Sequence, residues 1–513
     1  MSFVPGEVAV LAAVRSATLI GVDGQPVTVE VHVSSGLPAY QVVGLPDAAV
    51  RESRERVRAA VLSSGLEWPQ RRITVNLAPG GVRKTGSGLE LAVALGVLGA
   101  NDALPAGVLD GVAVLGELGL DGTVRPVPGT LALVDALARA GVSAVVVPMA
   151  NASEAGLVGD VRVRAARTLG ELRACLKGEE VWPDWDPPVA PPDDAAAVGM
   201  LDDEVVDLAD VRGLPFAREA LEVAAAGGHH LLFCGAPGTG KTMLARRLGT
   251  ILPPLSHPEA LEVTRIHSAA GVPLGGHLVR RRPFRAPHHT ASTAALVGGG
   301  SGRARPGEIT LAHRGILFLD ELGEFAPSAL DALRQPLEER AVRISRQGVS
   351  LTFPAAFQLV ACSNPCPCGA AGNECRCSDA QRDRYRRRLS APLLDRFDLR
   401  VRVDAPDADD VVGESSAEVA ARVAVAYERQ QTRYADWPWS QNAHVAAGAV
   451  PRLLPLGSEA EAVWRDVITD RQLTGRGATR IRRVARTLAD LDDSAGITGS
   501  HVESASAMRG DVP

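Results

Sequence analysis

Several features that would assign this chain to a common class are scarce in its sequence. Aromatic residues make up only 4% of the 513 residues, so the hydrophobic share of 46% comes mainly from Val, Leu, Ile and Ala. Such side chains suit a parallel sheet flanked by helices, whose strands are buried on both faces. The length exceeds that of one ordinary domain and predicts two to four domains.

Other absences exclude whole classes of protein. No apolar run reaches 18 residues, so we expect no membrane span, and the first 14 residues lack the basic start and cleavage site of a signal peptide. The formal net charge of −6 gives the chain no overall affinity for polyanions, so any nucleic-acid site must be a local patch. Five of the seven cysteines lie between positions 362 and 377, whereas a disulfide framework would spread them. We therefore expect reduced thiols and a cytoplasmic protein.

A proline- and aspartate-rich segment, 181–205, divides the chain into parts. Proline removes backbone donors and fixes φ, so this segment is interpreted as a linker. Alternating strand and helix signals predict one domain over residues 1–180 and an α/β domain over residues 206–405. Apolar residues at helical spacing predict a helical C-terminal lid over residues 406–513.

Local patterns predict individual elements of the first domain. Val27–Val33 alternates with period two, as a half-buried strand does. Asp47 is placed to cap a helix that ends near Ser64, in front of a glycine. The apolar segments Ile73–Leu77 and Leu89–Leu98 predict a strand and a buried helix.

A phosphate-binding loop follows the apolar strand His230–Cys234. The segment GAPGTGKT matches the pattern GxxxxGK[ST], whose glycines let backbone N–H groups point at phosphate oxygens. The helix expected from Thr242 to Leu252 would direct its positive end at the same anion, Lys241 would reach the terminal phosphates, and Thr242 would bind Mg²⁺. The predicted ATP contacts are Gly235, Pro237, Gly238, Thr239, Gly240, Lys241 and Thr242. The alternative is a structural glycine turn.

The apolar strand Ile316–Leu319 ends in two carboxylates, Asp320 and Glu321. Ligands of open α/β sheets bind at the carboxyl ends of strands. Asp320 would therefore hold Mg²⁺ through water, and Glu321 would act as the general base for the attacking water. An exposed acidic strand end is the alternative.

Polar residues elsewhere could complete such a site. Asn364 follows the strand Gln358–Ala361 and could orient the attacking water, although an asparagine turn before a proline is equally compatible. Arg396, in the segment LLDRFD, could act as an arginine finger on a neighbour's nucleotide, or pair with a nearby aspartate. Arg476, Arg480 and Arg483 share one helix face, where one could sense the γ-phosphate; a solvated basic face is the alternative.

These motifs occur together with others in a characteristic order. The further segments are RPFRAPHHTASTAALVGG from Arg282, PGE at Pro306–Glu308, NPCPCG from Asn364, PLLDRFDL from Pro392 and RVARTLADL from Arg483. The combination resembles the magnesium-chelatase-subunit-like AAA+ proteins of the ComM/YifB type over nearly the whole chain. This resemblance implies a homo-hexameric ring that uses ATP and Mg²⁺ and drives DNA branch migration during recombination of incoming strands.

The first domain resembles the proteolytic domain of Lon protease, which implies an α+β fold for residues 1–180. It departs from that domain at both catalytic positions. Lon-type enzymes carry a serine four residues after the lysine of a K-x-G segment, and here Gly88 stands four residues after Lys84. Their catalytic lysine is replaced here by Leu131. Ser87 is one position off and lacks a lysine partner, and a nucleophile needs a base within reach. We therefore expect a non-proteolytic scaffold.

Four cysteines form two close pairs within twelve residues. They are Cys366, Cys368, Cys375 and Cys377. Two such pairs can surround one structural Zn²⁺ tetrahedrally, although CxC is less usual than CxxC. Reduced surface thiols are the alternative, and Cys362, at a strand end, is expected to be packed.

Basic residues cluster in three places. Two runs contain Arg280, Arg281, Arg282 and Arg285, and Arg382, Arg384, Arg386, Arg387 and Arg388. Ala341–Phe353 is predicted to form a hairpin that carries Arg343 and Arg346, and in a ring such a hairpin could touch the backbone of single-stranded or branched DNA. Solvated charges or ion pairs between subunits are the alternative.

Two other functions compete with a DNA-translocating motor. The first is the motor subunit of a magnesium-chelatase complex, which typically lacks a long first domain and a cysteine cluster. The second is a protein unfoldase, but the aromatic-apolar-glycine pore grip of unfoldases is not evident between Phe284 and Ile309.

Overall fold

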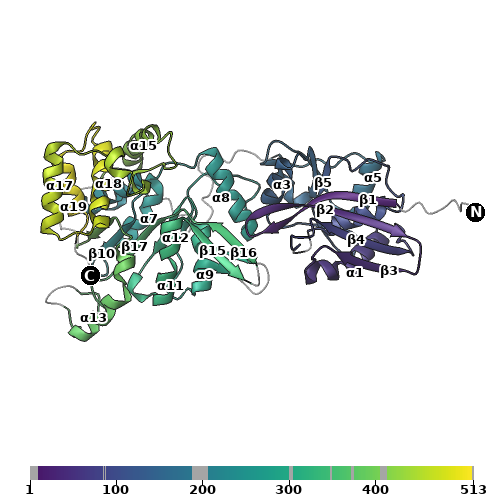
Figure 1. Ribbon diagram of the computed structural model, residues 1–513, viewed down its shortest axis with the longest axis horizontal. Coiled ribbons are helices and arrows are strands. Elements are labelled where there is room, and N and C mark those ends of the chain that lie inside the picture. Colours follow the sequence, from purple (N-terminus) through teal and green to yellow (C-terminus); the bar gives the residue numbers. More distant parts are fainter. Residues whose placement is uncertain are drawn as a thin grey trace, which may run out of the picture.

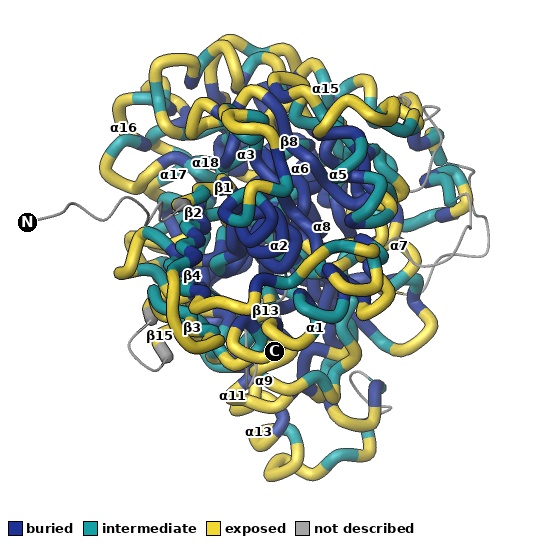
Figure 2. The backbone as a smooth tube through the Cα atoms, turned by 90° about the vertical axis from the view of Figure 1, so that its right-hand side faces the viewer, coloured by how far each residue is buried: buried dark blue, intermediate teal, exposed yellow. Residues whose placement is uncertain are grey.

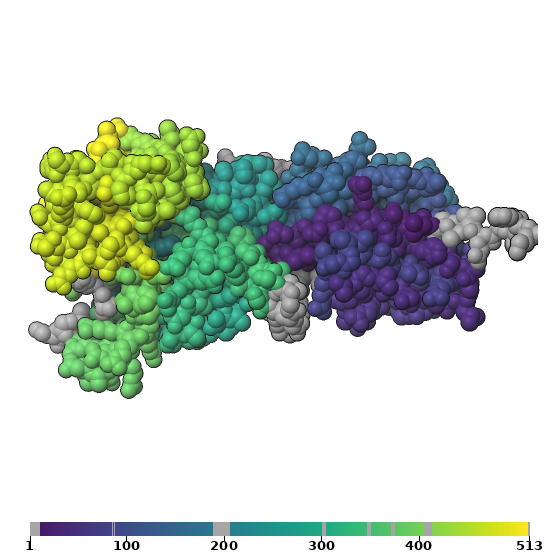
Figure 3. Space-filling model, viewed as in Figure 1, coloured from purple at the N-terminus to yellow at the C-terminus, as the bar shows by residue number. Residues whose placement is uncertain are grey.

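The computed structural model describes most of the chain. The described residues are 10–84, 86, 88–187, 206–299, 304–346, 349–370, 375–404 and 413–510. They form two lobes, an N-terminal one and a larger one that contains the helical C-terminal region (Figures 1 and 3). No helix among the described residues is long and apolar enough to span a membrane.

The N-terminal lobe is built on a mixed seven-stranded sheet with the order β3-β4-β2-β1-β5-β8-β9. Its strands are β1 Val10–Ile20, β2 Asp23–Ser34, β3 Ala39–Val43, β4 Arg72–Ala78, β5 Val112–Val114, β8 Ala144–Pro148 and β9 Arg162–Ala166. Strand β2 is antiparallel to both of its neighbours, β1 and β4, whereas β5, β8 and β9 run parallel to one another. Val14 packs on one face and Leu19 on the other, because successive side chains of a strand alternate.

Helices cover both faces of this sheet. They are α1 Ala48–Ser63, α2 Glu90–Gly99, α3 Thr130–Arg139, α4 Ala152–Gly156 and α5 Leu169–Lys177. Residues of α1, α2 and α5 share one hydrophobic cluster, and residues of α3 and α4 belong to another. The predicted cap is confirmed, since the Asp47 carboxylate accepts a 2.9 Å hydrogen bond from the Val50 N–H. The predicted strand at 73–77 and helix at 89–98 correspond to β4 and α2.

The second lobe contains an all-parallel sheet with the order β11-β14-β17-β10-β18. Its strands are β10 Leu231–Cys234, β11 Phe284–Arg285, β14 Ile316–Leu319, β17 Gln358–Ser363 and β18 Leu399–Arg402. Every residue of β10, β14 and β17 is buried, as expected where helices cover both faces. The predicted α/β class with a parallel sheet is thereby confirmed.

Helices surround this sheet and form most of the C-terminal region. They include α6 Pro215–Gly227, α7 Lys241–Ile251, α8 His257–Ala270, α13 Asp379–Arg388, α15 Ser416–Arg433, α17 Ser458–Asp470, α18 Gly475–Leu491 and α19 Gly499–Ala507. The helices α15 and α18 pack on α6 and bring the C-terminal helices against the sheet domain. Figure 2 shows α2, α3, α6 and α8 buried in the interior, whereas α13 is largely exposed at the periphery.

Helix α8 joins the two lobes. It packs against α3, the N–H of Gly129 donates a 3.1 Å hydrogen bond to the Ser268 carbonyl, and Arg265 lies 3.3 Å from the Asp135 carboxylate. The hairpin of β15 (Ala341–Arg346) and β16 (Val349–Pro354) adds Phe353, which is fully buried in a hydrophobic cluster shared with the N-terminal lobe. The two lobes therefore share one hydrophobic cluster, and α8 lies where they meet (Figure 1).

Candidate functional site

The predicted phosphate loop connects β10 to α7 at the carboxyl edge of the parallel sheet. Gly238 and Gly240 have φ values of +82° and +86°, which favour glycine, and a Cβ on Gly235 would lie 2.1 Å from the Val403 carbonyl oxygen. The Lys241 ammonium group donates hydrogen bonds of 2.8 and 2.6 Å to the carbonyls of Gly235 and Ala236. The lysine is thus held within the loop that would surround a phosphate.

Asp320, at the carboxyl end of β14, reaches the same place. Its carboxylate accepts a 2.8 Å hydrogen bond from the hydroxyl of Thr242. A hydroxyl and a carboxylate oxygen in contact are the donors that Mg²⁺ selects in phosphate-loop enzymes. The two residues therefore fit the predicted magnesium site.

Glu321 occupies an unusual position immediately after Asp320. Its φ is +52°, in the left-handed region that non-glycine residues rarely adopt, and its side chain is half exposed. The carboxylate lies 3.0 Å from Nδ1 of His289, which belongs to the segment after β11. The His289 ring also lies against that of His288, with centroids 4.0 Å apart and planes tilted by 35°. The contact between His289 and Glu321 was not anticipated, although both histidines stand in the quoted segment RAPHHT.

Asn364 lies where a residue that orients water was predicted. It follows Ser363, the last residue of β17, whose carbonyl accepts a 3.2 Å hydrogen bond from the Gly235 N–H. The segment that carries Asn364 therefore starts beside the phosphate loop. Its role in catalysis stays a prediction.

The predicted arginine finger and lid arginines gather at a different place. Arg396, Arg476, Arg480 and Arg483 line one cavity of about 250 Å³. Arg480 Nε lies 3.0 Å from the Asp398 carboxylate. The cavity is also lined by Gln358, the first residue of β17, and by His230, Gly315 and Asp398, which immediately precede β10, β14 and β18, so it lies at the amino edge of the sheet.

This cavity lies across the sheet from the phosphate loop. Strand β10 has four residues, which at about 3.3 Å each span about 13 Å between the two edges. Arg396 is 8% exposed, hydrogen-bonds to the Pro392 carbonyl at 2.9 Å and pairs with Glu338. The Nε atoms of Arg396 and Arg483 and one Nη of Arg480 are buried without a hydrogen-bond partner among the described residues. The fold therefore places these four arginines in one cavity, and Lys241 of the same chain is not among the residues that line it.

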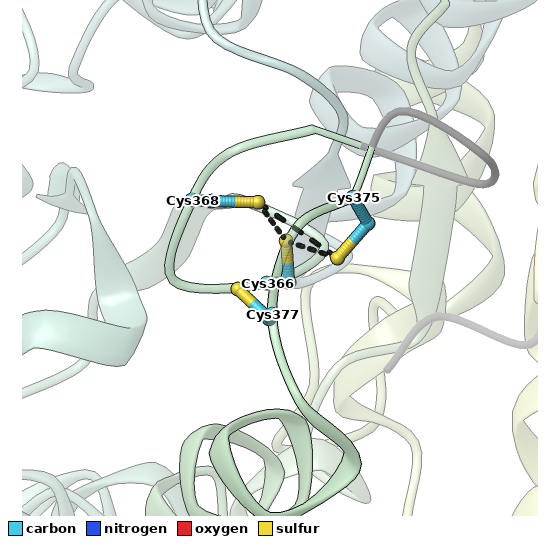
Figure 4. Close-up of side chains that lie close together, drawn as sticks. All are labelled: Cys366, Cys368, Cys375 and Cys377. Carbon is cyan, nitrogen blue, oxygen red and sulfur yellow. Dashed lines mark hydrogen bonds between the residues drawn. The ribbon is translucent and has the colours of Figure 1, made fainter.

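The four clustered cysteines form a compact thiol centre. All four Sγ atoms lie within 4.8 Å of one another (Figure 4). The Sγ atom of Cys366 is 3.2 Å from that of Cys368 and 3.4 Å from that of Cys375. A tetrahedral Zn²⁺ with Zn–S bonds of about 2.3 Å separates its sulfurs by about 3.8 Å. The thiols of Cys366, Cys368, Cys375 and Cys377 therefore fit a Zn²⁺ ion, whereas Cys362 is buried in β17.

The thiols also perturb one another. The Cys366 thiol is buried and shares a hydrogen bond with Cys368, and both effects raise the pKa of Cys366 to about 12. The same hydrogen bond, with backbone N–H groups, lowers the pKa of Cys368 to about 6. The centre thus favours a thiolate at Cys368, and the thiolate is the form that binds a metal.

The basic segments differ in how far their arginines are exposed and free to contact DNA. Arg343 on β15 is exposed and lies 3.2 Å from Glu339, whereas the side chain of Arg346 and the turn at 347–348 lie outside the described residues. Arg285 forms two hydrogen bonds, of 2.7 and 2.9 Å, with Glu308. The run around Arg285 therefore contributes an internal ion pair, and the hairpin retains an exposed basic residue.

The N-terminal lobe is apolar where a Lon-type protease needs its nucleophile and base. A Cβ on Gly88 would lie 3.5 Å from a methyl group of Val127, and Leu131 is only 1% exposed. Lys84 is fully buried, and its ammonium group hydrogen-bonds to the Pro79 carbonyl. Ser87 lies outside the described residues. The non-proteolytic scaffold stays a prediction.

Comparison with known proteins connects this geometry to a family. Three family models match the chain: "Magnesium chelatase, subunit ChlI" over residues 207–411, "Subunit ChlI of Mg-chelatase" over 29–151, and "Magnesium chelatase, subunit ChlI C-terminal" over 413–509. A protein of Mycobacterium tuberculosis is 47% identical over 93% of this chain and 94% of its own length. YifB of Escherichia coli is 42% identical and the competence protein ComM of Haemophilus influenzae is 40% identical, each over 97% of both chains. The chain therefore belongs to the magnesium-chelatase-subunit-like AAA+ ATPases of the ComM/YifB type.

Proposed function

We propose that this protein is an ATP-hydrolysing motor that moves along single-stranded or branched DNA and drives branch migration as a homo-hexamer in the cytoplasm. The observation that carries this proposal is the 40% identity with ComM over 97% of both chains. ComM is named for competence, the state in which bacteria take up DNA. A motor that remodels incoming DNA during recombination fits that name.

The assembled nucleotide site supports the ATPase part of the proposal. Lys241 binds the terminal phosphates, and Thr242 and Asp320, already in contact, hold Mg²⁺. Glu321 removes a proton from the attacking water, and Asn364 orients that water. When bound, Mg²⁺ neutralises charge that develops on the phosphate oxygens.

The arginine cavity supports the ring. Arg396, Arg476 and Arg483 lie across the sheet from their own phosphate loop, and buried donors of Arg396, Arg480 and Arg483 have no hydrogen-bond partner in the part of the chain that the structure describes. An anion supplied by a neighbouring subunit would satisfy these donors. We therefore assign Arg396 as the arginine finger, and Arg476 and Arg483 as lid arginines that act on the neighbour's nucleotide.

The remaining parts receive supporting roles. The four thiols hold one structural Zn²⁺. Residues 1–180 form a non-proteolytic Lon-like scaffold, 206–405 form the AAA+ domain, and 406–513 form the helical lid. Residues 181–205 are assigned as the linker, of which 188–205 lie outside the described residues. Arg343 and Arg346 on the β15–β16 hairpin contact the DNA backbone.

The test is ATP-dependent resolution of a labelled four-way junction, run beside unfolding of a tagged protein. We expect junction movement and no protein unfolding. Glu321→Gln should bind ATP and leave the junction unmoved, because general-base catalysis contributes about 100-fold or more to turnover.

A double variant separates DNA contact from hydrolysis. Replacing Arg343 and Arg346 by Ala should preserve basal ATPase activity. It should also make the slope of the logarithm of the DNA-binding constant against the logarithm of salt concentration less steep, by about 0.7 to 0.9 for each phosphate contact that is lost. Arg334→Ala, another exposed arginine of the same domain, is the matched control. Protein unfolding without any effect on DNA would contradict the proposal.

The names of the matching family models favour one alternative, the motor subunit of a magnesium-chelatase complex. That function requires partner subunits and a porphyrin, and it does not require DNA. If the ATPase rate is indifferent to single-stranded, duplex and four-way DNA, and the protein supports insertion of Mg²⁺ into a porphyrin, the alternative replaces the DNA motor.

A further inference from the structure

The thiol centre is connected directly to the nucleotide site. Residues 364–370 continue from β17, and β17 pairs with β10, from which the phosphate loop continues. The last paired residues are Ser363 and Cys234, and the Ser363 carbonyl accepts the N–H of Gly235 at 3.2 Å. The thiol segment and the phosphate loop therefore leave adjacent parallel strands side by side.

The thiol segment and the phosphate loop come close again at Gly369 and Pro237. A Cβ on Gly369 would lie 2.6 Å from Cγ and 2.8 Å from Cδ of Pro237, in the middle of the phosphate loop. Gly369 also has a φ of +81°, so both its backbone conformation and its contact favour glycine. Gly369 lies immediately after Cys368, and its N–H donates a 3.0 Å hydrogen bond to the Cys366 carbonyl. The segment that contacts Pro237 is thus a turn between two thiols.

Helix α13 provides a second connection on the other side of the thiol centre. It starts two residues after Cys377, and its Tyr385 is 4% exposed. The Tyr385 ring packs on Gly323, where a Cβ would lie 2.4 Å from the ring, and Arg388 donates a 3.1 Å hydrogen bond to the Gly323 carbonyl. Gly323 follows Glu321 by two residues, so α13 holds the segment that carries the general base.

We propose that Zn²⁺ at the four thiols and nucleotide at the phosphate loop bind cooperatively. Zn²⁺ fixes the turn that supports Pro237 and the start of α13, and both supports contact the nucleotide site. The inference rests on the proposed function in that the phosphate loop must bind nucleotide. Coupling between two sites is reciprocal, so nucleotide raises the affinity for Zn²⁺ by the same factor by which Zn²⁺ raises the affinity for nucleotide.

Zinc affinity provides a measurement that needs neither DNA nor hydrolysis. The full chain is titrated with the chromophoric chelator 4-(2-pyridylazo)resorcinol in magnesium buffer, with and without saturating ADP. We expect ADP to raise the Zn²⁺ affinity by about fivefold or more, the lower end of the usual couplings between sites. The affinity for a fluorescent ADP, measured with and without Zn²⁺, should change by the same factor.

A glycine pair tests the route of the coupling. Gly369→Ala retains all four thiols, so we expect a full complement of Zn²⁺ and a coupling factor close to one. Gly141→Ala is the matched control, because Gly141 has a φ of +77° and open space where a Cβ would be added. This control imposes similar backbone strain far from the thiols and should retain the coupling. If Gly369→Ala couples as strongly as the wild type, the Pro237 contact is not the route and the proposal fails.

The outcomes separate this proposal from the proposed function. If the zinc-loaded protein binds ADP and the Zn²⁺ affinity is unchanged, cooperativity is overturned and the ATPase assignment survives. If the protein does not bind ADP, both are overturned. If the thiols bind no Zn²⁺, the coupling is overturned whatever the DNA assays show.

Discussion

His289 and Glu321 illustrate how individual residues set the nucleotide site. The proposed general base lies 3.0 Å from a histidine nitrogen on the neighbouring segment, and Glu321 is held there in a left-handed backbone conformation. A carboxylate oxygen that is occupied by His289 is not free to accept a hydrogen bond from the attacking water. In this state His289 therefore restrains the base.

We expect His289→Ala to raise basal ATP hydrolysis severalfold, because the Glu321 carboxylate is released to bind water. His288→Ala is the matched control, since His288 is exposed and its recorded partners are Thr290 and the ring of His289. Phosphate release under saturating ATP measures both variants. A fall in the rate for His289→Ala would show that the contact positions the base productively rather than restraining it.

The nucleotide site could be predicted from sequence only in part. Lys241, Thr242 and Asp320 follow from short motifs, since a phosphate imposes a local backbone geometry. The partner of Glu321 could not be predicted, because His289 comes close only when β11 pairs with β14. The same holds for Gly369, whose contact with Pro237 joins segments more than a hundred residues apart.

At the scale of structural elements, the segment that carries the four thiols leads to a prediction about the metal content of the protein. Purified protein should contain about one Zn²⁺ per chain, and Cys366→Ser combined with Cys375→Ser should remove it, because two of four ligands are lost. Metal content by mass spectrometry of digested protein decides this. Cys175→Ser, at a buried thiol of the N-terminal lobe, is the control and should leave the metal in place. Metal-free wild-type protein, prepared without chelators, would leave the reduced-thiol interpretation standing.

Other elements show why some parts of the fold are evident in a sequence and others are not. Helix α1 could be predicted because its cap, Asp47, acts on an amide three residues away. The hairpin β15–β16 was likewise predicted from one contiguous segment. Strands β1 and β18 were not predicted. Strand β18 is short, and it is stabilised by pairing with β10, which is far away in the chain.

At the scale of the whole molecule, the role proposed for the arginine cavity predicts that activity depends on assembly. Lys241→Ala and Arg396→Ala should each be inactive alone. In a mixed ring, a site is intact where a subunit that retains Lys241 lies next to a subunit that retains Arg396. If the two variants assort randomly, this holds for roughly a quarter of all sites. ATP hydrolysis by an equimolar mixture, compared with each variant alone, measures this recovery.

Protein concentration provides the control for this prediction. Wild-type activity per subunit should fall on dilution below the concentration at which rings dissociate. Full activity in a strictly monomeric preparation would contradict action between subunits, and it would require the four arginines at the amino edge of the sheet to serve another purpose.

The attachment of the N-terminal lobe to α8 has a mechanical consequence. The lobe is anchored to α8 and the β15–β16 hairpin, which belong to the AAA+ part, and it extends outward from them (Figure 1). If α8 tilts, the lobe would tilt with it, because Gly129 and Asp135 contact α8 at Ser268 and Arg265. A small tilt of α8 during the ATP cycle would sweep the far edge of the lobe, at β3, through a much longer arc. Motion too small to detect near the nucleotide should be amplified there, where a fluorescent label could report it.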